Sequence, residues 1–505
     1  MNAVALLARG ILMPAVAGAV AVLGFAPFYA WPVPIASLAV LFHVWERSGS
    51  PVQAAISGFA FGLGFFLAGV SWVFVSLHVF GAMPLALAAI ATFIFCAYLA
   101  LLPAAAGWLV ARGSAEPLVR VVLLAPMAFV ALEWFRGWFF TGFPWLAMGW
   151  SQVPASPLAG FAPVVGTYGV SLAMAVAAGC AAALLRSAPW SRSRYALLAG
   201  AIALFAIGAA LRLVPWTHPE GEPIGMALVQ GNVAQELKWS DEARTKTYAD
   251  YLKAIVESEA RVVVIPETAL PAFFDRLPTG YVDAIRDHAR AKNQEVFLGV
   301  VERNASGDRL DYFNSLMSVG AGPPRAWRKR HLVPFGEYIP RGFGWVLAIL
   351  HIPLTDLGRG DAKQPPIPAA GINFGVAICY EDIFGEEMIA QLPDAAVLVN
   401  VSNDAWFGES LAADQHLQAS QVRALETGRW MVRATNTGVT AAIDARGRVV
   451  SRLPAFTQAT LNASVQPRGG STPYVRWGNF PVLAILAVGL FLGFTPRRPR
   501  EAPVP

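Results

Sequence analysis

Long apolar stretches separated by short polar turns make up the first 213 residues of the chain. A helix needs about 20 mostly apolar residues to cross a bilayer. The pattern predicts about eight transmembrane helices, near residues 6–26, 32–45, 54–76, 84–111, 121–137, 163–185, 194–213 and 477–495. The second stretch is short and the fourth is long, so we expect tilt or partial insertion there. The first also has the pattern of a signal peptide, but six more spans follow it before residue 214, and we interpret it as a membrane helix.

Residues 214–476 have a different pattern, in which short apolar runs alternate with amphipathic stretches. The runs predict strands at Ile224–Gln230, Val262–Pro266, Val296–Val301, Phe313–Val319, Phe374–Cys379, Ala396–Val401 and Val439–Ile443. The stretches between them predict helices at Asp241–Ala260, Gly280–Lys292, Phe384–Leu392 and Ala412–Gly428. This alternation favours an α/β layered domain. We therefore expect membrane helices in 1–213, an α/β domain in 214–476, an eighth membrane helix in 477–495 and a tail in 496–505.

Charge is distributed very unevenly between these regions. The chain is 56% hydrophobic and only 14% charged, and just 12 of its 71 charged side chains precede residue 214. If the N-terminus is cytoplasmic, every inside segment carries arginine: Arg9, Arg47, Arg112, Arg120, Arg186, Arg192, Arg194, Arg497, Arg498 and Arg500. Positive residues favour the cytoplasmic side, which puts the α/β domain outside the cytoplasm and both termini inside. The net charge of +5 then reflects membrane orientation, and we expect no nucleic-acid partner.

One charged pair does not follow this rule. Glu133 and Arg136 lie at the outer end of the fifth span, just before the aromatic segment 139–145. Charges at membrane depth usually face protein or water. The pair fits either an ion pair in an interfacial aromatic belt or one wall of a path for an acyl chain.

The three cysteines differ in their surroundings. Cys96 and Cys180 lie in apolar runs, which leaves Cys379 alone in the polar domain and rules out a disulfide framework. Cys379 ends an apolar run and is followed by Tyr380, Glu381 and a further carboxylate. A lone cysteine of this kind is often an inert buried thiol. A thiol at a strand end beside carboxylates is also where nucleophiles occur.

Other polar clusters come after apolar runs as well. Glu267 ends the run at 264–266, Lys329 and Glu337 flank a Pro-Gly turn, and Ser402-Asn403-Asp404 follows another run. Sites of α/β sheets form where strand ends meet loops. A reactive cysteine needs a base and a nearby cation, which a carboxylate and an ammonium would supply. Taken singly, these residues are equally compatible with solvated strand-end and surface charges.

Four segments in order, VIPET, RKRHLVPFGEY, CYED and SNDAWFG, resemble the nitrilase superfamily, whose sites use a Glu-Lys-Cys triad. The resemblance implies a nitrilase-like αββα sandwich, with Glu267 as the base and Cys379 as the nucleophile. It makes Lys329 the stabiliser of the thiolate and of the oxyanion, and Glu337 the second glutamate that supports this lysine.

The resemblance also implies roles for neighbouring residues. Tyr380 and Glu381 are expected to shape the pocket and to tune the triad. Trp239, Trp406 and Phe407 are expected as lids or acyl-chain contacts, although Trp and Phe near a membrane are often interfacial anchors. Asn314 is expected either as a substrate contact or as a core hydrogen-bonding group. No metal-ligand spacing is present in the sequence, and we expect no metal and no other cofactor.

The motif HLVPFGEY and the membrane spans before and after the α/β domain narrow the resemblance. Together they are similar to the apolipoprotein N-acyltransferases of the bacterial inner membrane. It implies that Cys379 takes an acyl chain from the sn-1 position of a phospholipid, typically phosphatidylethanolamine. The resulting thioester would acylate the α-amine of the diacylglyceryl-cysteine of an apolipoprotein, in ping-pong fashion. The catalytic domain would lie on the periplasmic side, and the protein is expected to be a monomer.

Two other classes of function agree with parts of this pattern. A membrane-anchored amidase or nitrile hydrolase would use the same triad with water as acceptor, but seven spans exceed what an anchor requires. A membrane scaffold or transporter with an inactive outer domain predicts a polar path through the membrane, whereas residues 51–111 contain no charged side chain.

Overall fold

A computed structural model describes residues 8–113, 116–235, 241–306, 309–340, 342, 344 and 356–495. The chain forms two compact units, and each is described by itself. The helical unit comprises 1–71, 90–214 and 479–505, and the α/β unit comprises 72–89 and 215–478. The sequence pattern did not indicate that 72–89 groups with the α/β unit. Trp239 and the expected tail, 496–505, lie outside the described residues.

Helices cover all eight apolar stretches. They are η1 (Ala8–Leu12), α2 (Met13–Ala21), η2 (Val22–Gly24), α3 (Pro32–Arg47), α4 (Pro51–Val70), α6 (Leu85–Arg112), α7 (Pro117–Val119), η4 (Arg120–Leu124), α8 (Ala125–Arg136), α9 (Ala162–Leu184), α10 (Arg192–Leu211) and α16 (Phe480–Phe494). Short turns η5 (Phe139–Thr141), η6 (Met148–Gln152) and η7 (Pro157–Phe161) join α8 to α9. In the described part of the chain, five stretches are long and apolar enough to span a membrane: Pro51–Val70, Leu85–Arg112, Pro117–Arg136, Pro157–Leu184 and Arg192–Leu211. The protein is therefore a multi-pass membrane protein.

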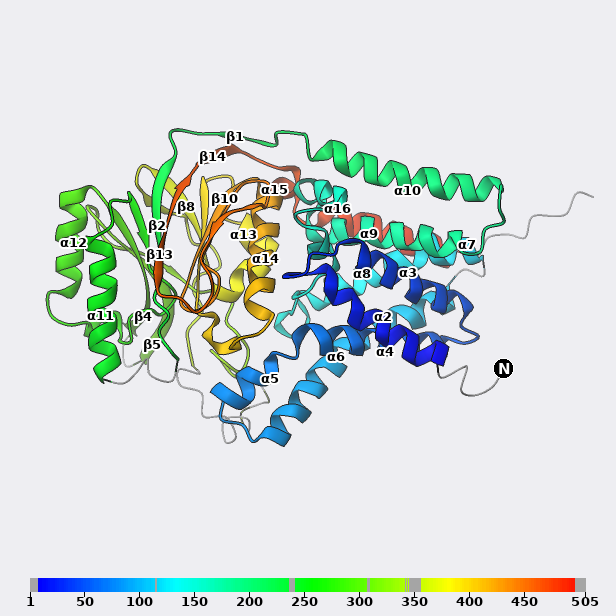
Figure 1. Ribbon diagram of the computed structural model, residues 1–505, viewed down its shortest axis with the longest axis horizontal. Helices are drawn as coiled ribbons and strands as arrows, with labels where there is room; N and C mark the ends of the chain where they lie inside the picture. The colour runs from blue at the N-terminus through cyan, green and yellow to red at the C-terminus, as the bar shows by residue number, and fades with distance from the viewer. Residues whose placement is uncertain are drawn as a thin grey trace, which may run out of the picture. The chain divides into compact units, whose positions relative to one another are not determined.

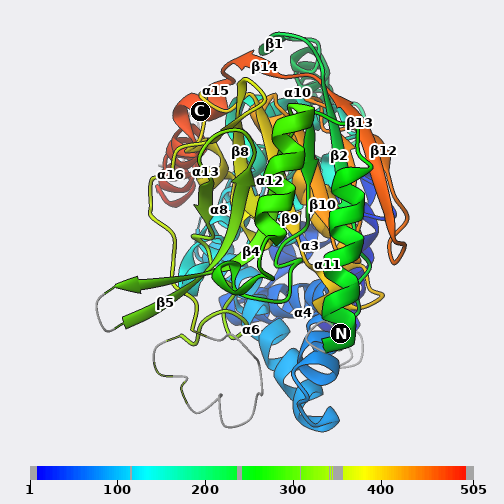
Figure 2. The same ribbon diagram turned by 90° about the vertical axis from the view of Figure 1, so that its left-hand side faces the viewer.

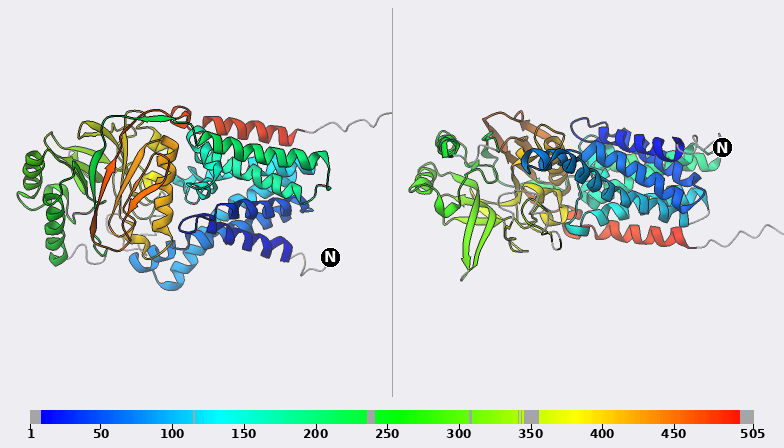
Figure 3. Two further views of the ribbon diagram at one scale, coloured as in Figure 1. Left: turned by 45° about the horizontal axis from the view of Figure 1, so that its top comes forward. Right: turned by 90° about the horizontal axis from the view of Figure 1, so that it is seen from below.

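Small residues bring the helices of this unit close together. A side chain at Gly18 of α2 would meet the Phe61 carbonyl of α4 at 2.0 Å, and one at Gly64 of α4 would meet the Ala15 carbonyl of α2 at 2.0 Å. Glycine at these places allows the two backbones to touch, as is common between membrane helices. The C-terminal helix α16, red in Figure 3, packs alongside α8 and α9.

The α/β unit is built on two six-stranded sheets. The first has the order β13-β2-β3-β4-β5-β6 and the second the order β12-β11-β10-β9-β8-β7. Strands of the first sheet are β2 (Ile224–Gln230), β3 (Val262–Val264), β4 (Glu295–Ser306), β5 (Arg309–Val319), β6 (Arg325–Arg328) and β13 (Ala459–Val465). Strands of the second are β7 (Ile367–Ala369), β8 (Ile372–Ile378), β9 (Val397–Ser402), β10 (Trp430–Thr435), β11 (Ala441–Ile443) and β12 (Val449–Arg452). A small ribbon pairs β1 (Thr217–Pro219) with β14 (Arg468–Gly470).

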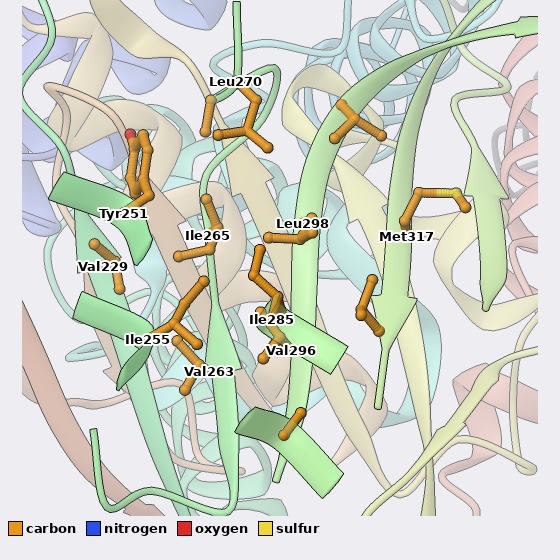
Figure 4. Close-up of a cluster of buried hydrophobic side chains, with 14 of the residues drawn as sticks. Val229, Tyr251, Ile255, Val263, Ile265, Leu270, Ile285, Val296, Leu298 and Met317 are labelled. Carbon is orange, nitrogen blue, oxygen red and sulfur yellow. The ribbon is translucent and has the colours of Figure 1, made fainter. Parts of the chain in front are cut away.

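Helices cover the outer face of each sheet. The first sheet carries α11 (Asp241–Val256) and α12 (Tyr281–Lys292), which lie over its strands in Figures 1 and 2. Apolar side chains of both helices pack on β3 and β4, as Figure 4 shows for Tyr251, Ile255, Ile285, Val263 and Val296. The second sheet carries α13 (Gly385–Ile389) and α14 (Ala412–Thr427), followed by α15 (Pro473–Trp477). The two sheets meet through rings such as Phe297 and Phe374, whose centroids lie 5.3 Å apart. This is the expected αββα sandwich.

Each sheet has the same core of three parallel strands. In the first sheet β2, β3 and β4 run parallel, and in the second sheet β8, β9 and β10 do so. Glu267 comes three residues after β3, Cys379 directly follows β8, and Asn403 directly follows β9. Polar residues therefore collect at the carboxyl ends of the parallel strands, where sites of α/β folds form.

Candidate active site

Cys379 lies at a sharp strand-to-helix turn. The strand β8 ends at Ile378, and the helical turn η10 (Cys379–Ile383) begins at once. Cys379 has φ +52°, in the left-handed region that a residue with a Cβ adopts at a cost of about 1–2 kcal/mol. Its side chain is buried, with the whole residue 8% exposed. A strained turn of this kind presents a nucleophile at the end of a sheet.

Two carboxylates surround one buried ammonium. Lys329 Nζ lies 3.2 Å from Glu267 Oε1 and 2.9 Å from Glu337 Oε1. Asn314 Nδ2 donates to the same two oxygens, at 2.7 Å and 3.0 Å. The backbone N–H of Asn403 donates to Glu267 Oε2 at 2.8 Å. The Oε1 atoms of Glu267 and Glu337 are thus each held by both Asn314 and Lys329. Glu267 Oε2 is held by Asn403, directly after strand β9 of the other sheet.

The electrostatics of this cluster keep Cys379 as a thiol at rest. Burial raises the pKa of Cys379 well above its ordinary value, and the Glu267 carboxylate raises it further, while the Lys329 ammonium opposes both. Burial alone would lower the pKa of Lys329, but Glu267 and Glu337 raise it well above its ordinary value, so the side chain stays an ammonium. A thiol in this setting needs a base at the moment of attack.

Glu381 joins the cysteine turn to the lysine segment. Its carboxylate accepts the backbone N–H groups of Arg330 at 2.6 Å, His331 at 3.1 Å and Ile378 at 2.8 Å. Burial raises the pKa of Glu381 to about 7, against the lowering effect of the Ile378 and Arg330 N–H groups. Ile378 directly precedes Cys379, and Arg330 directly follows Lys329. By bonding to both, the Glu381 side chain fixes the distance between the Cys379 and Lys329 segments.

The remaining expected residues lie in two other places. Tyr380 is buried against the rings of Phe384, at 5.2 Å, and His331, at 5.7 Å between centroids. Trp406 and Phe407 lie in the turn η11 (Asp404–Phe407), and their ring contacts are with Phe80 and Trp72.

Those last contacts come from the segment between two membrane helices. Trp72 precedes α5 (Val73–Val75), and its indole lies 4.6 Å from the Phe407 ring and donates to Gln415 Oε1 at 3.2 Å. The hydroxyl of Ser76, the first residue of η3 (Ser76–Phe80), donates to the Trp406 carbonyl at 2.8 Å. The segment 72–80 thus supports η11 directly.

Sequence reasoning missed a second group of buried charged side chains, Asp382, His416 and Arg433. They join Asp404 in a buried charge cluster directly behind Cys379. Asp382 and Asp404 lie within the motifs CYED and SNDAWFG, whereas Arg433 lies outside the four motifs. His416 had no such signal, because it is distant in sequence and lies on a polar helix.

Glu133 and Arg136, which had two interpretations, serve as anchors for the loop that follows α8. Glu133 Oε1 accepts the Met148 N–H at 2.7 Å, and Arg136 Nη1 donates to the carbonyls of Phe143 at 2.7 Å and Trp145 at 2.6 Å. Both side chains also line a small cavity whose other walls are mainly aromatic and aliphatic. The contacts to the backbone give these charges a structural reason for being in the helical unit.

An αββα sandwich with Glu, Lys and Cys at its strand ends belongs to the nitrilase class, and the carbon-nitrogen hydrolase family model matches residues 225–474. The apolipoprotein N-acyltransferase N-terminal domain model matches residues 17–180. The chain belongs to the apolipoprotein N-acyltransferase family, and it is an acyltransferase of lipoprotein maturation.

Two apolipoprotein N-acyltransferases support this assignment along almost the whole chain. The apolipoprotein N-acyltransferase of Nitrosomonas europaea is 48% identical over 94% of this chain and 95% of its own length. That of Methylococcus capsulatus is 46% identical over 97% of this chain and 95% of its own. The crystal structure of a carbon-nitrogen hydrolase from Helicobacter pylori G27 aligns with a TM-score of 0.36 and 15% identity, over 54% of this chain and 94% of that one.

Proposed function

We propose that Cys379 carries the acyl chain as a thioester between a phospholipid donor and the N-terminal amine of a diacylglyceryl apolipoprotein. The single observation that carries this proposal is the buried Glu267–Lys329–Glu337 cluster, in which the charges of Glu267 and Lys329 act on the Cys379 thiol. Membership in the apolipoprotein N-acyltransferase family supports the same two substrates.

In the first step, Glu267 removes the thiol proton as Cys379 attacks the sn-1 ester of phosphatidylethanolamine. Attack and proton transfer are coupled, because a free thiolate would add a third negative charge beside the carboxylates of Glu267 and Glu337. The Lys329 ammonium stabilises the oxyanion of the tetrahedral intermediate. Glu267 then protonates the leaving alcohol, and a lysophospholipid departs.

In the second step, the α-ammonium of the apolipoprotein cysteine gives a proton to Glu267, and the free amine that results attacks the thioester carbonyl. An α-amino group has a pKa near 8 in water, so a carboxylate positioned beside it supplies the free amine that attack requires. As the C–S bond breaks, the second proton of the nitrogen passes to the departing Cys379 sulfur, so the products are the amide and the regenerated thiol, and Glu267 releases its proton to water. Tyr380, Trp406, Phe407 and Trp239 are proposed to shape the pocket or the acyl-chain path.

We also infer that the α/β unit lies on the periplasmic side of the inner membrane, with both termini in the cytoplasm. The distribution of arginines between the apolar stretches supports this orientation. A lipid acyl donor and a lipid-modified acceptor would both reach the unit from the outer leaflet. On the resemblance to the family alone, we also expect the protein to work as a monomer.

The test is acylation of the purified full-length protein by phosphatidylethanolamine labelled in its sn-1 chain. We expect hydroxylamine-sensitive label on the wild type and none on Cys379→Ala. Cys180→Ala is the matched control, because it removes another buried thiol, and it should label like the wild type. Label on Cys379→Ala, or label that never becomes covalent, would show that the thioester proposal is wrong.

A second measurement separates transfer from hydrolysis. Diacylglyceryl lipopeptide added to the labelled enzyme should take the acyl chain onto its amine. Loss of label to water at the same rate without the peptide would instead favour an amidohydrolase. Label placed in the sn-2 chain should remain on the phospholipid.

A further inference from the structure

Four charged side chains form a closed, buried cluster behind the cysteine turn. Asp382, Asp404, His416 and Arg433 are each 2% exposed or less. Arg433 reaches Asp382 Oδ2 at 3.0 Å and Asp404 Oδ2 at 3.3 Å. His416 lies between the other oxygens of the same two carboxylates. When His416 and Arg433 each carry one positive charge, they balance the two negative charges of Asp382 and Asp404. The cluster is then neutral, which makes its burial less costly.

The hydrogen-bond geometry fixes the protonation state of His416. Its Nδ1 lies 2.9 Å from Asp404 Oδ1, and its Nε2 lies 2.9 Å from Asp382 Oδ1. Both partners are acceptors, so both ring nitrogens must carry a proton, and only the imidazolium does so. Burial and the Arg433 charge lower the pKa of His416, but Asp382 and Asp404 raise it to about 9.

The same imidazolium also touches the backbone of the cysteine. Nε2 lies 3.2 Å from the Cys379 carbonyl, which accepts a second bond from Asn400 Nδ2 at 3.0 Å. His416 and Asn400 therefore both hold the carbonyl of Cys379, whose φ of +52° lies in the left-handed region. A strained conformation persists only where its surroundings over-determine it. Released from these donors, Cys379 would relax and move its sulfur away from Glu267 and Lys329.

We propose that His416 is a positioning residue for acyl transfer, an imidazolium that Asp382 and Asp404 hold against the Cys379 carbonyl to fix the nucleophile in its left-handed conformation. Asp382, on η10, and Asp404, on η11, act through His416. Arg433, on β10, balances the two carboxylates. The proposal rests on the proposed role of Cys379 as the acylated residue.

The test compares single-turnover acylation of full-length wild type and His416→Gln by labelled phosphatidylethanolamine. Glutamine is neutral, and its side-chain amide can donate to only one of the two carboxylates, Asp382 or Asp404. We expect the acylation rate to fall about 10- to 100-fold, the range for losing a charged hydrogen bond at a reacting group. The lipid concentration that gives half the maximal rate should stay unchanged, because His416 does not belong to the proposed lipid path.

A second variant and a control keep the outcome decisive. Asn400→Leu removes the other donor to the same carbonyl without introducing charge, and it should lower the same rate without changing lipid affinity. Thr427→Val is the matched control, since Thr427 is a buried hydrogen-bonding residue of the same helix α14 that bonds to Arg423. It should acylate at the wild-type rate.

The outcomes separate this proposal from the one before it. No acylation of the wild type would overturn the thioester itself. Acylation of the wild type, with unchanged rates in folded His416→Gln and Asn400→Leu, would overturn the positioning role alone. If His416→Gln does not fold, the Asn400→Leu rate decides in the same way.

Discussion

Asn314 places one amide nitrogen between two carboxylates that would otherwise repel each other. Its Nδ2 bonds Glu267 Oε1 at 2.7 Å and Glu337 Oε1 at 3.0 Å, and its backbone carbonyl accepts the Lys329 N–H at 2.7 Å. The residue therefore positions three members of the site at once. This placement favours the core hydrogen-bonding interpretation over a substrate contact.

Replacing Asn314 by leucine should weaken catalysis strongly. The change keeps the volume but leaves two buried carboxylate oxygens each with one donor fewer, a loss of about 1–3 kcal/mol. If that loss falls on the transition state, the acylation rate drops about 5- to 150-fold. The measurement is single-turnover acylation, with Ser318→Ala on the same strand β5 as the control. Equal rates in Asn314→Leu and wild type would contradict this account of the residue.

At this scale the sequence predicts the candidate triad, but not most of the contacts that support it. Recognisable motifs contain Glu267, Lys329 and Cys379, so the resemblance predicts that these three residues share one site. The bond from the Asn403 N–H to Glu267 and the contacts of Glu381 with the lysine segment depend on how the two sheets meet. The contact of His416 with Cys379 depends on how α14 packs on the second sheet. Nothing in local spacing carries that information.

At the scale of elements, α14 explains why the charge cluster was missed. Half of its residues are polar, yet almost all of them are buried, among them Gln415, Gln418, Gln421 and Glu426. Polar helices usually face water. Here the polar groups face one another, as when Gln421 donates to the Gly447 carbonyl at 2.8 Å. Pattern alone predicted that the helix exists, and it gave no sign of what surrounds it.

The strands show the same division between what is local and what is not. Strand β2 begins and ends where its apolar run predicted, at Ile224 and Gln230. Strand β10 was not predicted, because Arg433 interrupts its apolar run. Its guanidinium is accommodated by the buried carboxylates of Asp382 and Asp404 and by the Ser420 hydroxyl. Strand β13 alternates polar residues along a sheet edge, a weak signal without its partner β2.

The segment 72–80 should stabilise η11 measurably. Ser76→Ala removes the bond to the Trp406 carbonyl, and a buried hydrogen bond is worth about 1 kcal/mol. We expect faster hydrogen exchange at the backbone amides of 404–408, measured by mass spectrometry. Exchange in α11, which packs on the other sheet, should not change. Equal acceleration everywhere would point to general loosening instead of this contact.

At the scale of the whole molecule, the charge cluster makes stability depend on pH. The ordinary pKa of His416 is 6.5, and its folded value is about 9, so its contribution is complete below pH 6.5 and is lost as pH rises through 9. Burial raises the pKa of Asp404, but His416 and Arg433 lower it from 3.8 to about 2. Its contribution is therefore present above pH 3.8 and is lost as pH falls through 2.

The difference between wild type and His416→Gln should report the upper limit of this range. We expect the gap in thermal unfolding midpoint to be widest at pH 6.5 and to narrow toward pH 9.5. The stability involved changes by at most about 1.4 kcal/mol per pH unit for one group. Glu381, which titrates near pH 7, is present in both proteins and cancels in the comparison. A gap that is constant across this range would contradict a charged His416.

The chain crosses between its two units at four points, after residues 71, 89, 214 and 478. The bonds from Trp72 and Ser76 join residues 343 and 330 positions apart. A ribosome that adds about 5–20 residues per second needs on the order of tens of seconds to cover that distance. During this time the rings of Trp72 and Phe80 have no contact with Phe407 and Trp406, which are not yet synthesised. Docking of this segment is therefore a late event in biosynthesis, and a nascent chain that stalls before residue 406 would leave Trp72 and Phe80 exposed to chaperones and proteases.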